Sequence, residues 1–178
     1  TAVCGSGKVV YGKGALVAKR VLSTKTLERI LQVIARYKDT YLAYFDEGPA
    51  EPPLDVSIRP AWMIFGVTQA QVDYINAHYD SFTAAQGPNT VPHDKDFISV
   101  GILAPQDRLA REAMFDDVLT QIPEIDLVSP YTGWYDVNPK GFSKADGFKI
   151  LLEYLNLAPD EVVFCGDSGN DLTLLELS

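Results

Sequence analysis

VVFCGDSGND, residues 162–171, is the stretch that decides the fold class of this chain. Its four apolar residues predict a short buried strand at 161–165, and the Gly, Asp and Asn residues that follow predict a tight loop at 166–170. A further helix is expected to begin at Asp171. Ligands bind at the carboxyl ends of strands in open α/β sheets, so this loop is the first candidate for a functional site.

The residues before this stretch complete a helix–strand–loop–helix pattern. Ser143 and Asp146 form an S-x-x-D capping box, which predicts the start of a helix. The expected helix has one apolar face, made by Phe148, Leu151, Leu152 and Leu155. This order of elements is typical of a doubly wound parallel sheet, so residues 139–178 are expected to belong to an α/β fold.

Residues 1–138 follow a different pattern of short strands, helices and polar loops. Gly12-Lys13-Gly14 separates two β-branched runs and predicts a hairpin. Helices are expected to begin at Ser23 or Thr24, at Thr68 and at Asp107, strands at 40–45, 96–103, 126–129 and 134–137, and loops at 47–60 and 84–96. Together they predict an α+β module, a small antiparallel sheet with helices on one side.

Composition excludes several classes of protein. The chain has 178 residues, 47% hydrophobic and 22% charged, which is enough to bury a core. Its net charge of −9 argues against a nucleic-acid partner, which would require a clustered basic surface. No run approaches the roughly 20 apolar residues of a membrane span. Cys4 and Cys165 form no ligand or disulfide pattern, so we expect free thiols and a reducing, cytoplasmic location.

Two carboxylates, Asp167 and Asp171, bracket the 166–170 loop. Mg²⁺ takes one or two carboxylates, keeps several waters and contacts substrate phosphate oxygens, so the pair suits a metal-assisted phosphate site. The glycines allow a close approach to a ligand, and the following helix offers free N–H groups to an anion. The alternative is structural, with Asp167 as a turn residue and Asp171 as a helix N-cap.

Lys144 lies in the first turn of the expected helix after Ser143, where a cation gains nothing from the helix dipole. It is either a solvated lysine or a group that neutralises a transferring phosphoryl group. The second interpretation favours a phosphate-handling site.

Two separated segments resemble motifs III and IV of the haloacid dehalogenase superfamily: Asn138-Pro139-Lys140-Gly141-Phe142-Ser143-Lys144 and, about twenty residues later, Gly166-Asp167-Ser168-Gly169-Asn170-Asp171. Within the superfamily the chain is most similar to the Cof-type and sucrose-phosphatase-like sugar phosphatases. Residues 3–11 resemble the strand and hairpin that follow motif II there. The resemblance implies a partial HAD-like, Rossmann-like three-layer α/β core at 1–22 and 139–178, with an inserted α/β cap at 23–138.

The resemblance also implies roles for four residues. Lys144 would contact the phosphoryl group and the nucleophile, Asp167 would bind Mg²⁺ directly, and Asn170 would donate a hydrogen bond near the phosphoryl oxygens. Asp171 would orient the site or bind the metal through water. The implied activity is hydrolysis of a small phosphorylated metabolite, a sugar phosphate, through an aspartyl phosphate. A phosphomutase of the same superfamily is an open alternative.

One departure from the family is large. Its nucleophile belongs to a D-x-D motif on the first core strand, and a Ser or Thr of motif II follows the next strand. The early part of this chain has no D-x-D followed by a Thr-bearing turn, and Asp116-Asp117 fall within an expected helix. We therefore expect an excerpt of a longer protein that is inactive alone. The rival interpretation is a non-catalytic binding or interaction module.

Overall fold

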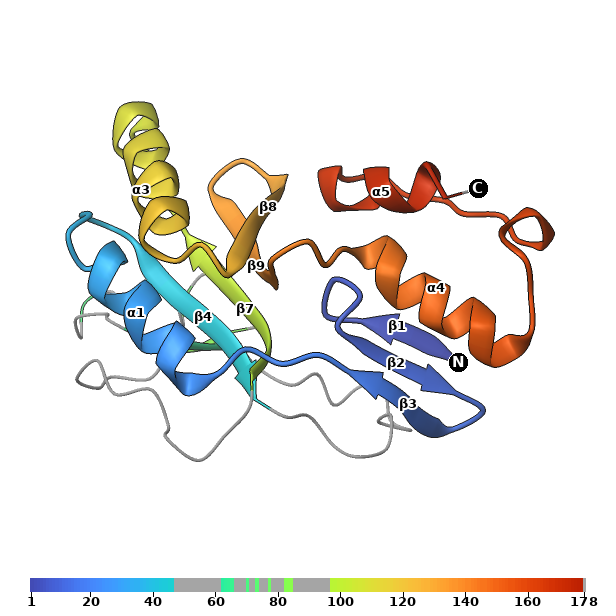
Figure 1. The fold of residues 1–178 in the computed structure, drawn as a ribbon. Coiled ribbons are helices and arrows are strands. Elements are labelled where there is room, and N and C mark those ends of the chain that lie inside the picture. Colours follow the sequence, from blue (N-terminus) through green and yellow to red (C-terminus); the bar gives the residue numbers. More distant parts are fainter. Residues whose placement is uncertain are drawn as a thin grey trace.

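Two sheets, one of three strands and one of six, organise the part of the chain that the structure describes. The structure is a computed structural model, and it describes residues 1–46, 62–65, 82–84 and 97–177, with the single helical positions 70, 73 and 77. Each sheet has its own helices, and the two sheet-and-helix units lie side by side (Figure 1). The chain crosses between them after β3 and again after β9.

The three-stranded sheet contains the expected hairpin. Its strands are β1 (Ala2–Cys4), β2 (Val9–Gly12) and β3 (Ala15–Lys19), all antiparallel. Lys13 and Gly14, between β2 and β3, have φ angles of 51° and 83°, the left-handed conformation that two-residue hairpin turns require. Val9 and Val10 of β2 are buried, and α4 (Lys144–Leu155) packs against this sheet.

The six-stranded sheet has the order β6-β5-β4-β7-β9-β8. Its strands are β4 (Tyr41–Asp46), β5 (Trp62–Phe65), β6 (Phe82–Ala84), β7 (Phe97–Leu103), β8 (Ile125–Tyr131) and β9 (Trp134–Pro139). All neighbours are antiparallel except β5 and β6, which are parallel. The four strands expected from the sequence in this region are therefore confirmed as β4, β7, β8 and β9.

Two helices bury one face of this sheet. The first, α1 (Thr24–Ile34), has Ser23 as its N-cap, and α3 (Arg108–Gln121) has Asp107, whose carboxylate accepts from Ala110 N–H at 2.8 Å. The core between helices and sheet contains Leu27, Ile30, Leu31, Ile34, Met114, Val118, Leu42, Val100, Ile102 and Val137. The expected helices at 23 and 107 are confirmed, whereas the loops at 47–60 and 84–96 and most of the helix from Thr68 lie outside the described residues.

The described helices contain no long apolar run. None of them is long and apolar enough to cross a bilayer. Cys4 and Cys165 are free thiols, as expected.

Close backbone packing joins the β1–β2 turn to the start of α4. Gly7 has a φ of 95°, and a Cβ there would lie 2.6 Å from the Ser143 carbonyl oxygen. A Cβ on Gly147 would lie 2.3 Å from the Gly7 carbonyl oxygen. Both contacts are to backbone, which cannot rotate away, so glycine is required at both positions. The turn also reaches the other unit, because a Cβ on Gly5 would lie 3.1 Å from the carbonyl oxygen of Ile98 in β7.

The strand expected at 161–165 is wrong. Pro159–Glu161 form a 3-10 turn, Val162 is extended with φ −129° and ψ 154°, and no strand within the described residues pairs with 162–165. A strand needs a neighbour about 4.8 Å away to satisfy its backbone groups, and none of the described strands lies beside this segment. Val163 is consequently 89% exposed. The helix expected from Asp171 begins one residue later, as α5 (Leu172–Leu175).

Gly147→Ala should destabilise the chain by roughly 1–3 kcal/mol, because the new Cβ collides with backbone that cannot repack. An unconstrained helix would respond in the opposite direction and gain up to about 1 kcal/mol. Urea unfolding of the purified variant measures the change. Lys149→Ala, on the exposed side of α4, is the control and should be nearly neutral; a Gly147→Ala variant as stable as wild type would contradict the packing described above.

Candidate active site

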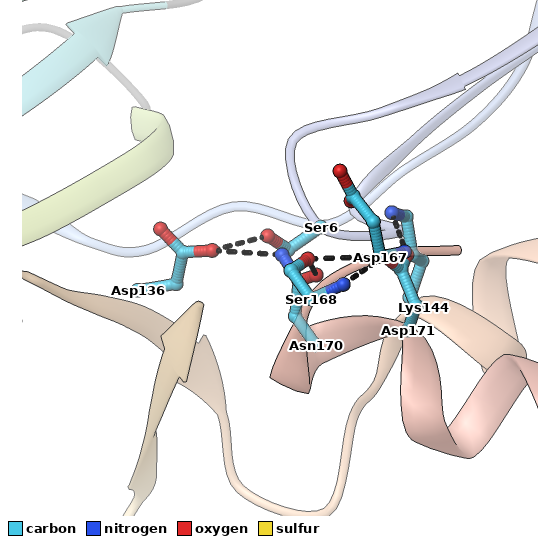
Figure 2. Close-up of polar contacts among 7 residues, drawn as sticks. All are labelled: Ser6, Asp136, Lys144, Asp167, Ser168, Asn170 and Asp171. Atoms are coloured by element: carbon cyan, nitrogen blue, oxygen red, sulfur yellow. Dashed lines mark hydrogen bonds and ion pairs between the residues drawn. The ribbon is translucent and has the colours of Figure 1, made fainter. Parts of the chain in front are cut away.

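An ion pair joins the start of α4 to the loop at 166–171. Lys144 is the first residue of α4, and its Nζ contacts Asp171 Oδ1 (Figure 2). The Lys144 side chain is 27% exposed and that of Asp171 only 7%. The pair brings together two residues that the sequence analysis selected separately.

The loop folds around the Asp171 carboxylate. Asp171 Oδ2 accepts hydrogen bonds from the backbone N–H groups of Asp167 and Ser168, both at 3.2 Å, and lies 3.0 Å from the Ser168 hydroxyl. The hydrogen bond from Lys144 is the main reason that the pKa of Asp171 falls to about 2, although burial opposes the shift. Asp171 is therefore ionised at neutral pH, and both its oxygens are engaged in holding the loop and orienting Lys144.

Asp167 has the opposite environment. Its side chain is exposed, and its carboxylate makes no hydrogen bond or ion pair with the residues that the structure describes. Figure 2 shows it pointing away from the Asp171 cluster. A carboxylate in this state is available to a ligand, whereas Asp171 is not.

Asn170 lies between the loop and β9. Its Oδ1 is 2.6 Å from the Ser168 hydroxyl, and its Nδ2 is 3.5 Å from Asp136 Oδ2. Asn170 and Lys144 line the same small cavity, about 40 Å³ in volume, together with Ser6, Val128, Asn138, Ser143, Gly169 and Thr173. The four candidate residues of the sequence analysis are thus gathered within one loop and the adjoining helix start; their functional roles stay predictions.

Three polar residues near this loop were not predicted from the sequence. Ser6, Lys8 and Asp136 connect the β1–β2 turn to β9, with Ser6 Oγ donating to Asp136 at 2.7 Å. Burial lowers the pKa of Lys8 to about 8, against the opposing effect of the Asp136 charge. The contacts span about 130 positions. No local sequence pattern indicates such a pairing, since each of these residues considered alone is typical of a turn or of a strand face.

Comparison with known proteins identifies the family. The sequence model of the haloacid dehalogenase-like hydrolases matches residues 1–178. The chain belongs to this family. Its α/β architecture, with a partial HAD-like core, agrees with that of a solved relative, the HAD subclass IIB sugar phosphatase BT4131, at a TM-score of 0.70 and 15% identity. The resemblance and the fold class inferred from the sequence are confirmed.

The sequence relatives match to different extents. MG265 of Mycoplasma genitalium, named as a candidate phosphatase, is 22% identical, and the match covers 94% of this chain and 63% of MG265. A 52-residue stretch is 36% identical to the chloroplastic endoribonuclease YBEY of Arabidopsis thaliana, covering 29% of this chain and 9% of that protein. The BT4131 match covers 97% of this chain and 59% of BT4131. This haloacid dehalogenase-like chain therefore spans about three fifths of MG265 and of BT4131.

The donor set of this family member suits a magnesium ion in part. No group of three or more His, Cys, Asp and Glu side chains comes together within the described residues. Asp167, whose backbone N–H contacts Asp171, nevertheless has an exposed carboxylate with no partner among the described residues. Mg²⁺ in phosphoryl-transfer sites often takes one or two carboxylates with substrate oxygens and waters. The residues present would fit a shared site in which Asp167 would be the ligand from this chain.

Acid should weaken the fold through Asp171. Because its folded-state pKa lies below the ordinary value, its contribution is complete above about pH 5 and is lost as the pH falls toward 2. Thermal melting of Asp171→Asn should show a lower Tm at pH 7 and a shallower loss of stability between pH 5 and 2, with the difference on the order of 1–2 kcal/mol. Asp116→Asn, exposed on α3, is the control, and a pH profile of Asp171→Asn that overlays wild type would contradict the assignment.

Proposed function

We propose that this chain is the larger part of a Mg²⁺-dependent phosphohydrolase that acts on a small phosphorylated metabolite through an aspartyl-phosphate intermediate. The observation that carries the proposal is the Lys144–Asp171 pair beside the free carboxylate of Asp167. The nucleophilic Asp belongs to a segment outside these 178 residues. An attacking carboxylate and a phosphoryl group are both anionic, so their approach requires fixed positive charge.

Lys144 supplies that charge. Its ammonium group is held at one end by Asp171, which leaves its remaining N–H donors for a phosphoryl oxygen. Asp171 is itself held by two backbone N–H donors of the loop, so Lys144 needs little reorganisation when a substrate binds. The Asn170 amide, on the same cavity, adds a neutral donor.

Magnesium would be held by Asp167 and would neutralise charge on the phosphoryl oxygens. Asp171 would act on the site through Lys144 and the loop backbone, because its oxygens already accept from Lys144 and from two backbone N–H groups.

The proposal assigns different roles to the two units. Residues 1–22 and 139–178 would form the core, and residues 23–138 the cap that selects the substrate. The name of BT4131 describes a sugar phosphatase, which supports a sugar phosphate as the substrate class. The net charge of −9 is compatible with a cation-dependent enzyme for anionic substrates, and the two free cysteines support the cytoplasm.

A non-catalytic binding module is the second candidate, and one observation favours it. The sequence contains a single D-x-D, Asp94-Lys95-Asp96, which comes directly before β7 in the sequence and outside residues 1–22 and 139–178, the segments proposed for the core. It cannot serve as the family's nucleophile motif in that place. A phosphomutase would use the same Lys144 and Asp167 and differs from a phosphatase in the acceptor of the phosphoryl group.

The chain of residues 1–178 should not hydrolyse an aryl phosphate in the presence of Mg²⁺, because it holds no nucleophile. A protein with the same residues and the preceding family segment that bears D-x-D should do so. Release of the aryl alcohol from both proteins, with and without EDTA, measures this. EDTA-sensitive hydrolysis by the shorter chain would show that the nucleophile lies within it.

Asp167→Asn should abolish Mg²⁺-dependent hydrolysis in the longer protein while its Tm stays within about 1 °C of wild type. The physical reason is that the Asp167 carboxylate has no partner to lose in the part of the chain that the structure describes and, without metal, stands near the Asp171 charge. Asp160→Asn, exposed on the 159–161 turn, is the control for both measurements. Retained hydrolysis with a clearly lowered Tm would make Asp167 a structural turn residue.

A further inference from the structure

Asp136 is a buried carboxylate that the proposed mechanism does not use. It lies on β9 and is 9% exposed. Its Oδ1 accepts a 2.7 Å hydrogen bond from the Trp134 indole N–H, and its Oδ2 accepts one of 2.7 Å from the Ser6 hydroxyl. A longer contact of 3.5 Å joins the same Oδ2 to Asn170 Nδ2 (Figure 2). Asp136 therefore contacts β9, the β1–β2 turn and the loop with Asp167.

The negative charge of Asp136 has a nearby counter-charge. A buried carboxylate costs several kcal/mol unless other groups compensate for its lost hydration. Lys8 is 1% exposed, and its Nζ donates to the Val137 carbonyl oxygen at 3.1 Å and to Asn138 Oδ1 at 2.6 Å. Both acceptors follow Asp136 directly on β9. The turn that supplies Ser6 thus also supplies the compensating cation.

Only a carboxylate satisfies all three partners of Asp136. Trp134, Ser6 and Asn170 each point a donor at it, on both of its oxygens. An amide in this place would present one acceptor and one donor, and the donor would face another donor. A charged carboxylate is therefore needed at position 136, because three N–H and O–H donors point at this side chain.

Asp136 determines which way the Asn170 amide faces. The Ser168 hydroxyl, 2.6 Å from the other end of that amide, can donate or accept and so tolerates either orientation. Asp136 can only accept, so it selects the orientation with Nδ2 toward β9. The second Nδ2 hydrogen has no partner among the described residues and is available beside the cavity that Asn170 shares with Lys144.

We infer that Asp136 is a positioning residue for phosphate binding, which acts by fixing the Asn170 amide as a donor and by tying β9 to the loop. The inference rests on the proposed function, because Asn170 meets a phosphoryl group only there. It assigns β9, which would belong to the cap, a direct influence on the phosphate site. Ser6 and Lys8 support Asp136 in this role from the β1–β2 turn.

A double-mutant cycle in the longer, D-x-D-containing protein tests the inference. Competitive inhibition of aryl phosphate hydrolysis by inorganic phosphate is measured for wild type, Asp136→Asn, Asn170→Ala and the double variant. Each single change should raise the inhibition constant roughly tenfold, the value of one hydrogen bond to a charged group, and the double variant should be no worse than either. Asp117→Asn, which removes another carboxylate that accepts a 2.6 Å bond, should leave the constant unchanged.

Two outcomes would overturn the inference: an unchanged inhibition constant in Asp136→Asn, or single effects that multiply to roughly a hundredfold in the double variant, as independent sites do. If the protein shows no activity, NMR provides a second measurement. The Asn170 side-chain amide signal, identified by its loss in Asn170→Ala, should move in Asp136→Asn and stay in Asp117→Asn. A wild-type protein that hydrolyses nothing refutes the proposed function, whereas an Asn170 signal that does not move refutes the positioning role.

Discussion

The contact of the Gly7 backbone with the start of α4 is the constraint on which the rest of the arrangement depends. Because no side chain separates the turn from Ser143 and Gly147, the turn lies against the helix end that carries Lys144. That placement also brings Ser6 and Lys8 next to β9. The two segments in which the chain crosses between the units therefore lie near this turn. Arg20 N–H bonds the Lys8 carbonyl oxygen while Lys8 Nζ bonds Val137, so one lysine adjoins both crossings.

The two aspartates of the 166–171 loop differ in burial and in hydrogen bonding. Asp171 is ionised, buried and fully hydrogen-bonded, so it behaves as part of the scaffold. Asp167, four residues earlier, is held among the described residues through its backbone N–H, and its side chain is exposed. A scaffold role thus explains the contacts of Asp171, whereas the Asp167 carboxylate has no partner among the described residues, and its functional role stays a proposal.

The local sequence pattern predicted an element correctly wherever the contacts that determine the element are local. The hairpin at Gly12–Gly14, the caps at Ser23, Asp107 and Ser143, and the helical faces of α1 and α4 follow from residues within a few positions of each other. The strand at 161–165 failed because its apolar pattern specifies burial in a sheet, and pairing depends on a neighbour that local sequence does not name. Asp136 and Lys8 were missed for the same reason, since their partners lie about 130 residues away.

The exposed segment at 162–165 has a consequence for the behaviour of the chain in solution. Val-Val-Phe-Cys is rich in β-forming residues, carries no charge and contains no proline, and Val163 is almost fully solvated. Backbone groups of 163–165 make no backbone hydrogen bond within the described residues. An exposed segment of this kind can pair with a strand of another molecule, so association through it should increase with protein concentration. A single lysine at Val163 would interrupt this pairing without touching the core.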